Sequence, residues 1–170
     1  MPLLNRAVEH AHEAVQKASL KRRALRGMGT TLIVLCVRGA TAYLSHVGDS
    51  RAYLHRGSSM EQITTDHSLD LHTDQDVMLR ELFFFHHARV LSQAVGPSKK
   101  VVCDGHSVEL RQGDIILLCS DGLTDMLSEY AVHEIISTHI PDIDRTADVL
   151  VEAANAMGGK DNISLVLAMW

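Results

Sequence analysis

The chain has 170 residues, 46% of them hydrophobic, and a formal net charge of −5 at pH 7. These values predict one globular domain over residues 1–170, and the negative charge argues against a nucleic-acid partner. No apolar run approaches the length of a membrane span and no signal peptide opens the chain, so neither a membrane partner nor export is expected.

The first part of the chain predicts a helix followed by three strands. Apolar residues recur at spacings of four and three along residues 3–22, which is helical periodicity. Two stretches rich in β-branched and apolar residues, 30–37 and 41–48, flank a short turn and predict an antiparallel hairpin. A third strand is expected at 51–57.

Residues 58–100 predict a long insert, or flap, between strands. The segment is polar at first and then predicts a short helix at 76–85. Every phenylalanine of the chain lies at 83–85, and this triplet is either a core-facing anchor or an exposed contact patch. Long inserts of this kind are often functional, and we expect this one to be the most mobile part of the chain.

The remainder predicts strands and helices in a mixed order. The expected elements are a hairpin-like pair at 101–110 and 113–120, helices at 123–127, 130–139 and 145–157, and a closing strand at 162–170. Helices grouped around largely antiparallel strands predict an α+β fold.

The cysteines and histidines give weaker information. Three cysteines without C-x-x-C spacing indicate reduced thiols in a cytoplasmic protein. The eleven histidines are scattered, so solvated or hydrogen-bonded side chains are the simpler interpretation. A histidine-rich metal-binding or storage domain is the alternative from a different functional class.

Three predicted strand ends carry an acid beside glycine. They are "HVGDSR" with Asp49, "CSDGLTD" with Asp121 and Asp125, and "GGKDNIS" with Asp161. Carboxylates gathered at strand ends repel one another unless a cation neutralises them, and oxygen-only ligands favour Mg²⁺ or Mn²⁺. Each acid taken alone is more often a helix cap or a turn residue, and spacing does not decide between the two interpretations.

Six motifs follow one another in the order seen in type 2C protein phosphatases, the metal-dependent serine/threonine phosphatases. They are "GMGTTL", "HVGDSRAYL", "TTDHSL", "LSQAVG", "GDIILLCSDGLTDML" and "GGKDNISLVL". From about residue 4 onward the chain resembles the bacterial single-domain members. The resemblance implies an antiparallel β-sandwich flanked by helices, with two Mn²⁺ or Mg²⁺ ions, or three in the complete family site. It also implies in-line attack of water on phosphoserine or phosphothreonine in proteins, with no catalytic group beyond the metal-bound water.

The resemblance assigns roles to the acidic turns. Asp121 and Asp161 match metal ligands of the binuclear core. Asp49 and Asp125 match carboxylates linked with a weaker third metal. Asn162 and Gly122 are expected to support these ligands without binding metal themselves.

The chain also departs from the family pattern. The usual arginine, Glu-Asp pair and "DGxGG" turn ahead of the first helix have no counterpart, which predicts an N-terminally truncated form of the fold. The usual "HPxRN" is altered to "HHARV". We therefore expect impaired activity, or alternatively a non-catalytic pseudophosphatase that acts as a binding or regulatory module. Sheet surface left bare predicts a possible homodimer.

Overall fold

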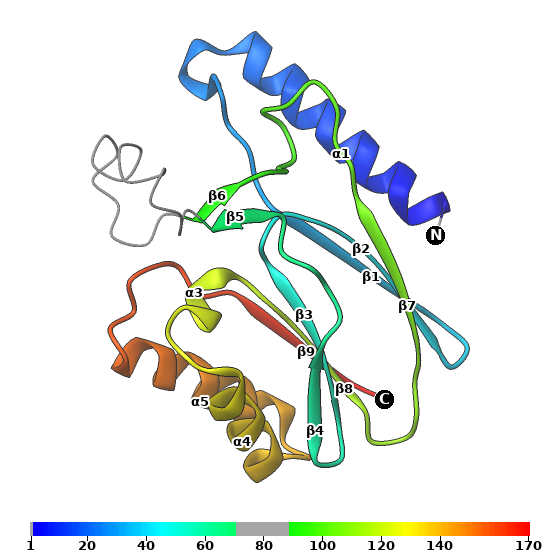
Figure 1. Cartoon of the computed structure of the whole chain (residues 1–170), viewed down its shortest axis with the longest axis vertical. Coiled ribbons are helices and arrows are strands. Elements are labelled where there is room, and N and C mark those ends of the chain that lie inside the picture. The colour runs from blue at the N-terminus through cyan, green and yellow to red at the C-terminus, as the bar shows by residue number, and fades with distance from the viewer. Residues whose placement is uncertain (1, 71–88) are drawn as a thin grey trace.

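A computed structural model describes residues 2–70 and 89–170 (Figure 1). The helix expected at 76–85 and the phenylalanine triplet lie outside the described residues. The helices are α1 (Pro2–Lys21), the short 3₁₀ helix η1 (Arg23–Leu25), α3 (Asp121–Thr124), α4 (Glu129–His139) and α5 (Ile143–Ala156). The strands are β1 (Leu32–Arg38), β2 (Thr41–Val47), β3 (Arg51–Arg56), β4 (Ser59–Gln62), β5 (Ser68–Asp70), β6 (Arg89–Leu91), β7 (Asp104–Glu109), β8 (Ile115–Cys119) and β9 (Leu165–Met169).

The described strands form antiparallel sheets. One sheet has the order β1-β2-β7, a second has the order β4-β3-β8-β9, and β5 pairs with β6. Helix α1 lies along the first sheet, whereas α4 and α5 lie against the second (Figure 1). The predicted α+β class, an antiparallel sandwich flanked by helices, is confirmed. No helix in the described residues is both long and apolar enough to cross a membrane.

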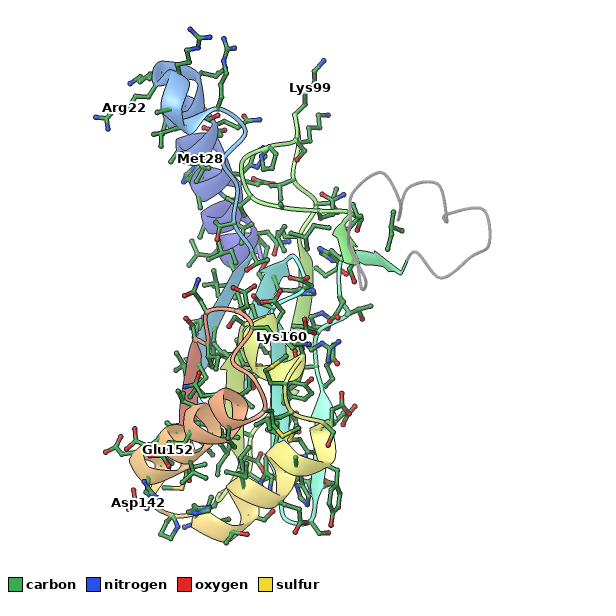
Figure 2. The ribbon with its side chains drawn as sticks, turned by 90° about the vertical axis from the view of Figure 1, so that its left-hand side faces the viewer. Arg22, Met28, Lys99, Asp142, Glu152 and Lys160 are labelled. Carbon is green, nitrogen blue, oxygen red and sulfur yellow. The ribbon has the colours of Figure 1, made fainter. Side chains whose placement is uncertain are left out.

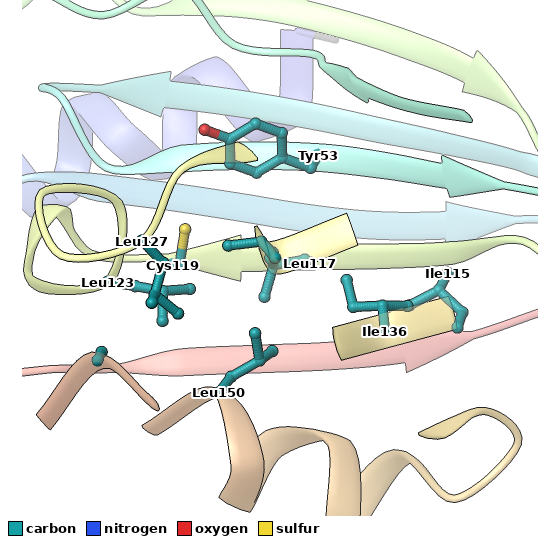
Figure 3. Packing of buried hydrophobic residues seen from close by; sticks show 10 residues of the cluster. Tyr53, Ile115, Leu117, Cys119, Leu123, Leu127, Ile136 and Leu150 are labelled. Atoms are coloured by element: carbon teal, nitrogen blue, oxygen red, sulfur yellow. The ribbon is translucent and has the colours of Figure 1, made fainter. Parts of the chain in front are cut away.

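Strand β8 shows why the sandwich holds together. Its five apolar residues alternate between two cores, as the period of two in a strand requires. Ile116 packs toward the first sheet, in a cluster with Leu44 of β2 and Leu54 of β3. Ile115, Leu117 and Cys119 point the other way, where side chains of the helices cover them (Figure 3). A strand buried on both faces gives a continuous apolar run in the sequence.

Strand β3 is buried on both faces as well. Ala52 and Leu54 join the core between the sheets, while Tyr53 and His55 face the helices. The Nε2 of His55 lies 3.0 Å from the hydroxyl of Ser137 on α4. A polar residue is therefore buried here because a helix supplies its partner.

The hairpin expected from residues 101–110 and 113–120 is wrong. Strand β7 pairs with β2 in the first sheet and β8 pairs with β3 in the second, so the turn between them crosses from sheet to sheet. Asp114 in this turn is 1% exposed and accepts hydrogen bonds from Arg56 Nε and Nη2 at 2.8 and 2.6 Å. The Arg56 guanidinium holds the pKa of Asp114 below its ordinary value. This ion pair fixes the crossing point.

Other boundaries also differ from the sequence-based expectation. The expected insert begins with a regular strand, because β4 pairs with β3 at the edge of the second sheet. Thr64 and Val95, which also belong to the expected insert, are buried. Helix α3 begins at Asp121 rather than at Leu123.

Candidate functional site

The acidic turns meet at one end of the second sheet. Arg51 of β3 pairs with Cys119 of β8, and Cys119 pairs with Leu165 of β9. The turn that carries Asp49 precedes β3, α3 follows β8, and the turn that carries Asp161 precedes β9. Because these strands are antiparallel in this register, all three turns lie at the same end of the sheet.

Two of the turns are in direct contact. The hydroxyl of Ser120 donates to the Asn162 carbonyl at 3.2 Å and accepts from the Ser164 amide at 3.0 Å. A Cβ built on Gly122 would lie 2.3 Å from the Asn162 carbonyl oxygen. Glycine is required at 122 because the two backbones approach too closely for any side chain.

Asp121 is the first residue of α3 rather than its cap. Ser120 occupies the cap position, and it makes no side-chain capping bond because its hydroxyl is used in the contact with Asn162 and Ser164. The pKa of Asp121 is raised by burial first, and then by the charges of Asp125 and Asp161. Three carboxylates therefore act on one another here, and a cation would relieve their repulsion.

The other acids differ in exposure. Asp125 ends α3, where its amide donates to the Asp121 carbonyl at 2.8 Å, and its side chain is exposed. Asp161 is exposed and its Oδ1 accepts from the Asn162 amide at 2.6 Å. Asp49 is 8% exposed in the turn between β2 and β3. The structure thus brings the predicted residues to one edge, with Asn162 in contact through its backbone.

The donor chemistry of this edge fits part of a site for a hard cation. All four candidate ligands offer carboxylate oxygens, which suit Mg²⁺ and Mn²⁺. Within residues 2–70 and 89–170, however, no three or more histidine, cysteine, aspartate or glutamate side chains are grouped closely enough to hold a metal ion. Mg²⁺ commonly keeps several waters and needs only one or two carboxylates, so these aspartates are compatible with a partly hydrated ion.

A polar network that the sequence did not predict supports the Asp49 turn. Arg51 donates to both carboxylate oxygens of Asp66, with the shortest distance 2.7 Å from Nη2 to Oδ2, and these bonds raise its pKa. The His67 amide donates to the Gly48 carbonyl at 3.0 Å, and the Gly48 amide donates to His67 Nδ1 at 3.3 Å. Asp66 and His67 both lie in the motif "TTDHSL", which marked this segment in the sequence but does not indicate what either residue contacts.

The histidines of the first sheet also gather, which scattered positions in the sequence did not indicate. The ring of His46 stacks on that of His67 with 4.6 Å between centroids, and the ring of His106 lies 5.5 Å away. His67 Nε2 lies 3.3 Å from Asp104 Oδ2. These residues belong to β2, β7 and the segment before β5.

Comparison with known proteins gives consistent results. The sequence profile of the family described as "Protein phosphatase 2C" matches residues 2–163. The chain is 40% identical over 146 residues to protein phosphatase PhpP of Streptococcus pneumoniae, an alignment that covers 85% of this chain and 59% of the relative. It is 32% identical over 166 residues to serine/threonine phosphatase stp of Listeria monocytogenes, covering 96% of this chain and 66% of that protein.

Solved structures agree with these matches. The serine/threonine phosphatase Stp1 from Staphylococcus aureus superposes with a TM-score of 0.83 at 28% identity, over 99% of this chain and 66% of that one. The phosphatase PstP/Ppp of Mycobacterium tuberculosis gives 0.77 at 32% identity, over 93% and 67%. The chain therefore spans less than two thirds of the length of the pneumococcal relative that it matches.

Proposed function

Because the chain belongs to the protein phosphatase 2C family, we propose that it contributes to metal-dependent hydrolysis of phosphoserine and phosphothreonine in proteins. The observation that carries the proposal is the acidic edge, where burial and two neighbouring carboxylates raise the pKa of Asp121. The substrates are phosphoproteins, and the attacking group is water, so the bond between phosphorus and the serine or threonine oxygen breaks as a bond to water oxygen forms.

We assign the cation-binding role to Asp121 and Asp161, with Asp49 and Asp125 as further carboxylates. When bound, Mg²⁺ or Mn²⁺ supplies positive charge for the phosphoryl group and lowers the pKa of water. Gly122 and Asn162 support the site by their close backbone contact, which fixes the α3 start against the turn before β9.

We further propose that turnover by these 170 residues alone is slow. A two-metal mechanism needs both ions held firmly, and the described residues gather no set of three or more ligands. The same observation favours the second candidate, a pseudophosphatase that binds phosphoproteins without hydrolysing them. The free state of all three cysteines supports a cytoplasmic location, and the open edges of β1 and β9 support a homodimer.

Turnover of p-nitrophenyl phosphate and of a phosphothreonine peptide with Mn²⁺ tests the proposal. We expect slow hydrolysis that Asp121→Asn and Asp161→Asn each abolish. Asp148→Asn on the exposed face of α5 is the matched control and should leave the rate unchanged. Binding of the phosphopeptide without any turnover would favour the pseudophosphatase. Turnover that survives Asp121→Asn would refute the assigned site.

A further inference from the structure

One end of the molecule carries a dense group of basic side chains, although the whole chain is negative. We call it the basic end, and it consists of Lys21, Arg22, Arg23, Arg26, Lys99 and Lys100. All six side chains are exposed. Figure 2 shows Arg22 and Lys99 at the same end of the molecule, with Asp142 and Glu152 at the opposite end. No acidic residue occurs in the sequence between Glu13 and Asp49, or from residue 89 to residue 103.

The two basic segments are held together by specific contacts. Gln16 Nε2 donates to the Ser98 carbonyl, which joins α1 to the loop before the lysines. Thr30 and Val95 exchange backbone hydrogen bonds of 3.0 and 2.9 Å. The Gly96 amide donates to Nδ1 of the buried His12 at 3.0 Å. These contacts hold the segment that follows α1 and the loop that precedes Lys99 side by side, so the basic side chains lie together because the backbone is fixed.

Local interactions do not neutralise this charge. Lys17, one turn earlier on α1, pairs with Glu13 at 3.3 Å. In the part of the chain that the structure describes, none of the six residues of the basic end forms an ion pair. Favourable interaction with the helix dipole is confined to the last turn, which contains Lys21 alone among the six. Within residues 2–70 and 89–170, the remaining five charges have no ion-pair partner that would explain them.

The chain connects the basic end to the candidate site through the segment that follows Arg26. The Thr31 hydroxyl is 2.8 Å from that of Ser50, which follows Asp49, and a Cβ on Gly48 would meet the Thr31 side chain. Thr31 is five positions after Arg26, and five extended residues span at most about 18 Å. An extended polypeptide of about ten residues can therefore reach from Arg22, which is nine positions before Thr31, to the turn that carries Asp49.

We propose that the basic end binds an acidic segment of the phosphoprotein that lies within about ten residues of the phosphorylated side chain. The inference rests on the proposed function and identifies the class of substrate. Complementary charge at such a distance speeds encounter and selects among substrates without taking part in the chemistry.

The surface is less suited to other anionic partners. Membrane binding grows with the apolar area that is buried, and among the described residues Leu20 and Val102 alone are exposed large apolar residues next to these charges in the sequence. Single-stranded nucleic acid is held by stacking on aromatic rings, and residues 2–30 and 93–103 contain no phenylalanine, tyrosine or tryptophan.

The first test measures binding alone, so it does not depend on turnover. A fluorescent, unphosphorylated glutamate-rich peptide is titrated at low salt with the wild type, with Arg22→Glu/Arg23→Glu, and with Arg111→Glu/Arg145→Glu. The last variant makes the same change in net charge at exposed positions away from the basic end. We expect about tenfold weaker binding for the first variant and little change for the second. Equal weakening in both would overturn the proposal, because net charge alone would then explain the binding.

The second test compares two phosphothreonine peptides, one with an acidic run and one with serines in its place. We expect Arg22→Glu/Arg23→Glu to raise KM for the acidic peptide only, with kcat and the turnover of p-nitrophenyl phosphate unchanged. If the wild type did not hydrolyse p-nitrophenyl phosphate at all, the proposed function would be refuted. The binding test above would then decide on its own whether the basic end is a docking surface. Tighter binding to phosphatidylserine vesicles or to DNA than to the acidic peptide would overturn the inference.

Discussion

At the scale of single residues, the ring of His46 is held in one protonation state by its neighbours. Its Nε2 lies 2.8 Å from the Thr65 carbonyl, which can only accept, so the neutral ring carries its hydrogen on Nε2. Nδ1 is buried and has no hydrogen-bond partner among the described residues. Protonation would create an unsatisfied donor and add charge beside His67 and His106. Burial is the main cause of the lowered pKa of His46, and these two histidines lower it further, while Thr65 and Asp104 oppose them.

We predict that the protein loses stability as the pH falls below 6.5, the unperturbed histidine pKa. Because the folded-state pKa of His46 lies below that value, the unfolded chain takes up the proton first. Each such proton changes the free energy of unfolding by at most about 1.4 kcal/mol per pH unit. His55 acts in the same direction, since burial and then His133 lower its pKa.

Urea unfolding between neutral and mildly acidic pH measures this effect. His46→Gln retains a donor for Thr65 and should flatten the pH dependence. His10→Gln, at an exposed position on α1, should leave it as in the wild type. If His46→Gln left the pH dependence unchanged, the His46 ring would take up protons equally in the folded and unfolded states, and the prediction would be wrong.

The sequence predicted which acids to examine, but not what surrounds them. Strand ends and motif order pointed to Asp121 and Asp161, because glycine and acid beside an apolar run are visible locally. The contact of Ser120 with Asn162 and the need for glycine at 122 depend on the pairing of β8 with β9, which are more than forty residues apart. Spacing along the chain contains no information on that register.

At the scale of elements, most helices and strands followed from periodicity, but their partners did not. Residues 101–110 and 113–120 have the pattern of a hairpin, and their strands nevertheless join different sheets. A short turn between two strands can join strands of one sheet or of two sheets, and here the turn with the buried, ion-paired Asp114 joins two sheets. Strand β4 was missed because its polar sequence, "SMEQ", lacks the apolar alternation of a covered strand.

The segment from Thr64 to His67 is held by several polar contacts, which include the ion pair of Arg51 with Asp66. The Asp66 carboxylate accepts hydrogen bonds from the Arg51 guanidinium, and Thr64 Oγ1 accepts one from the Ala52 amide at 3.0 Å. The Arg51 and Asp66 side chains are only 15% and 16% exposed, so removing the Asp66 carboxylate takes an ion-pair partner from a largely buried Arg51 guanidinium.

We predict that Asp66→Asn destabilises the protein by about 1–3 kcal/mol and loosens this segment. Hydrogen exchange of the His67 amide, which donates to the Gly48 carbonyl, should become faster. Glu13→Gln removes the acid of an exposed ion pair and should change stability by less than about 0.5 kcal/mol. Equal effects of the two substitutions would contradict the role given to burial.

At the scale of the whole molecule, the sandwich has open strand edges. Among the described strands, β1 and β9 each pair on one side only. Val37 beside one edge is 40% exposed, and Val166 on the other is 58% exposed. Exposed strand edges with apolar side chains tend to pair with another chain.

We predict that the chain forms a dimer through one of these edges. Sedimentation equilibrium should give twice the chain mass of 18.7 kDa at high concentration. Val166→Lys places a charge at the β9 edge and should shift the equilibrium toward monomer, whereas Lys160→Gln outside the strand should not. A monomer at all concentrations would refute the dimer.

Cys119 is buried between the second sheet and the helices, so the rate at which its thiol is alkylated reports on opening of this core. Its thiol is 4% exposed, and burial raises its pKa to about 12, so almost no reactive thiolate exists at neutral pH. Cys36 is exposed and should be alkylated at once. Alkylation of Cys119 must wait until the helices move away from β8, so its rate in the native protein reports how often that layer opens.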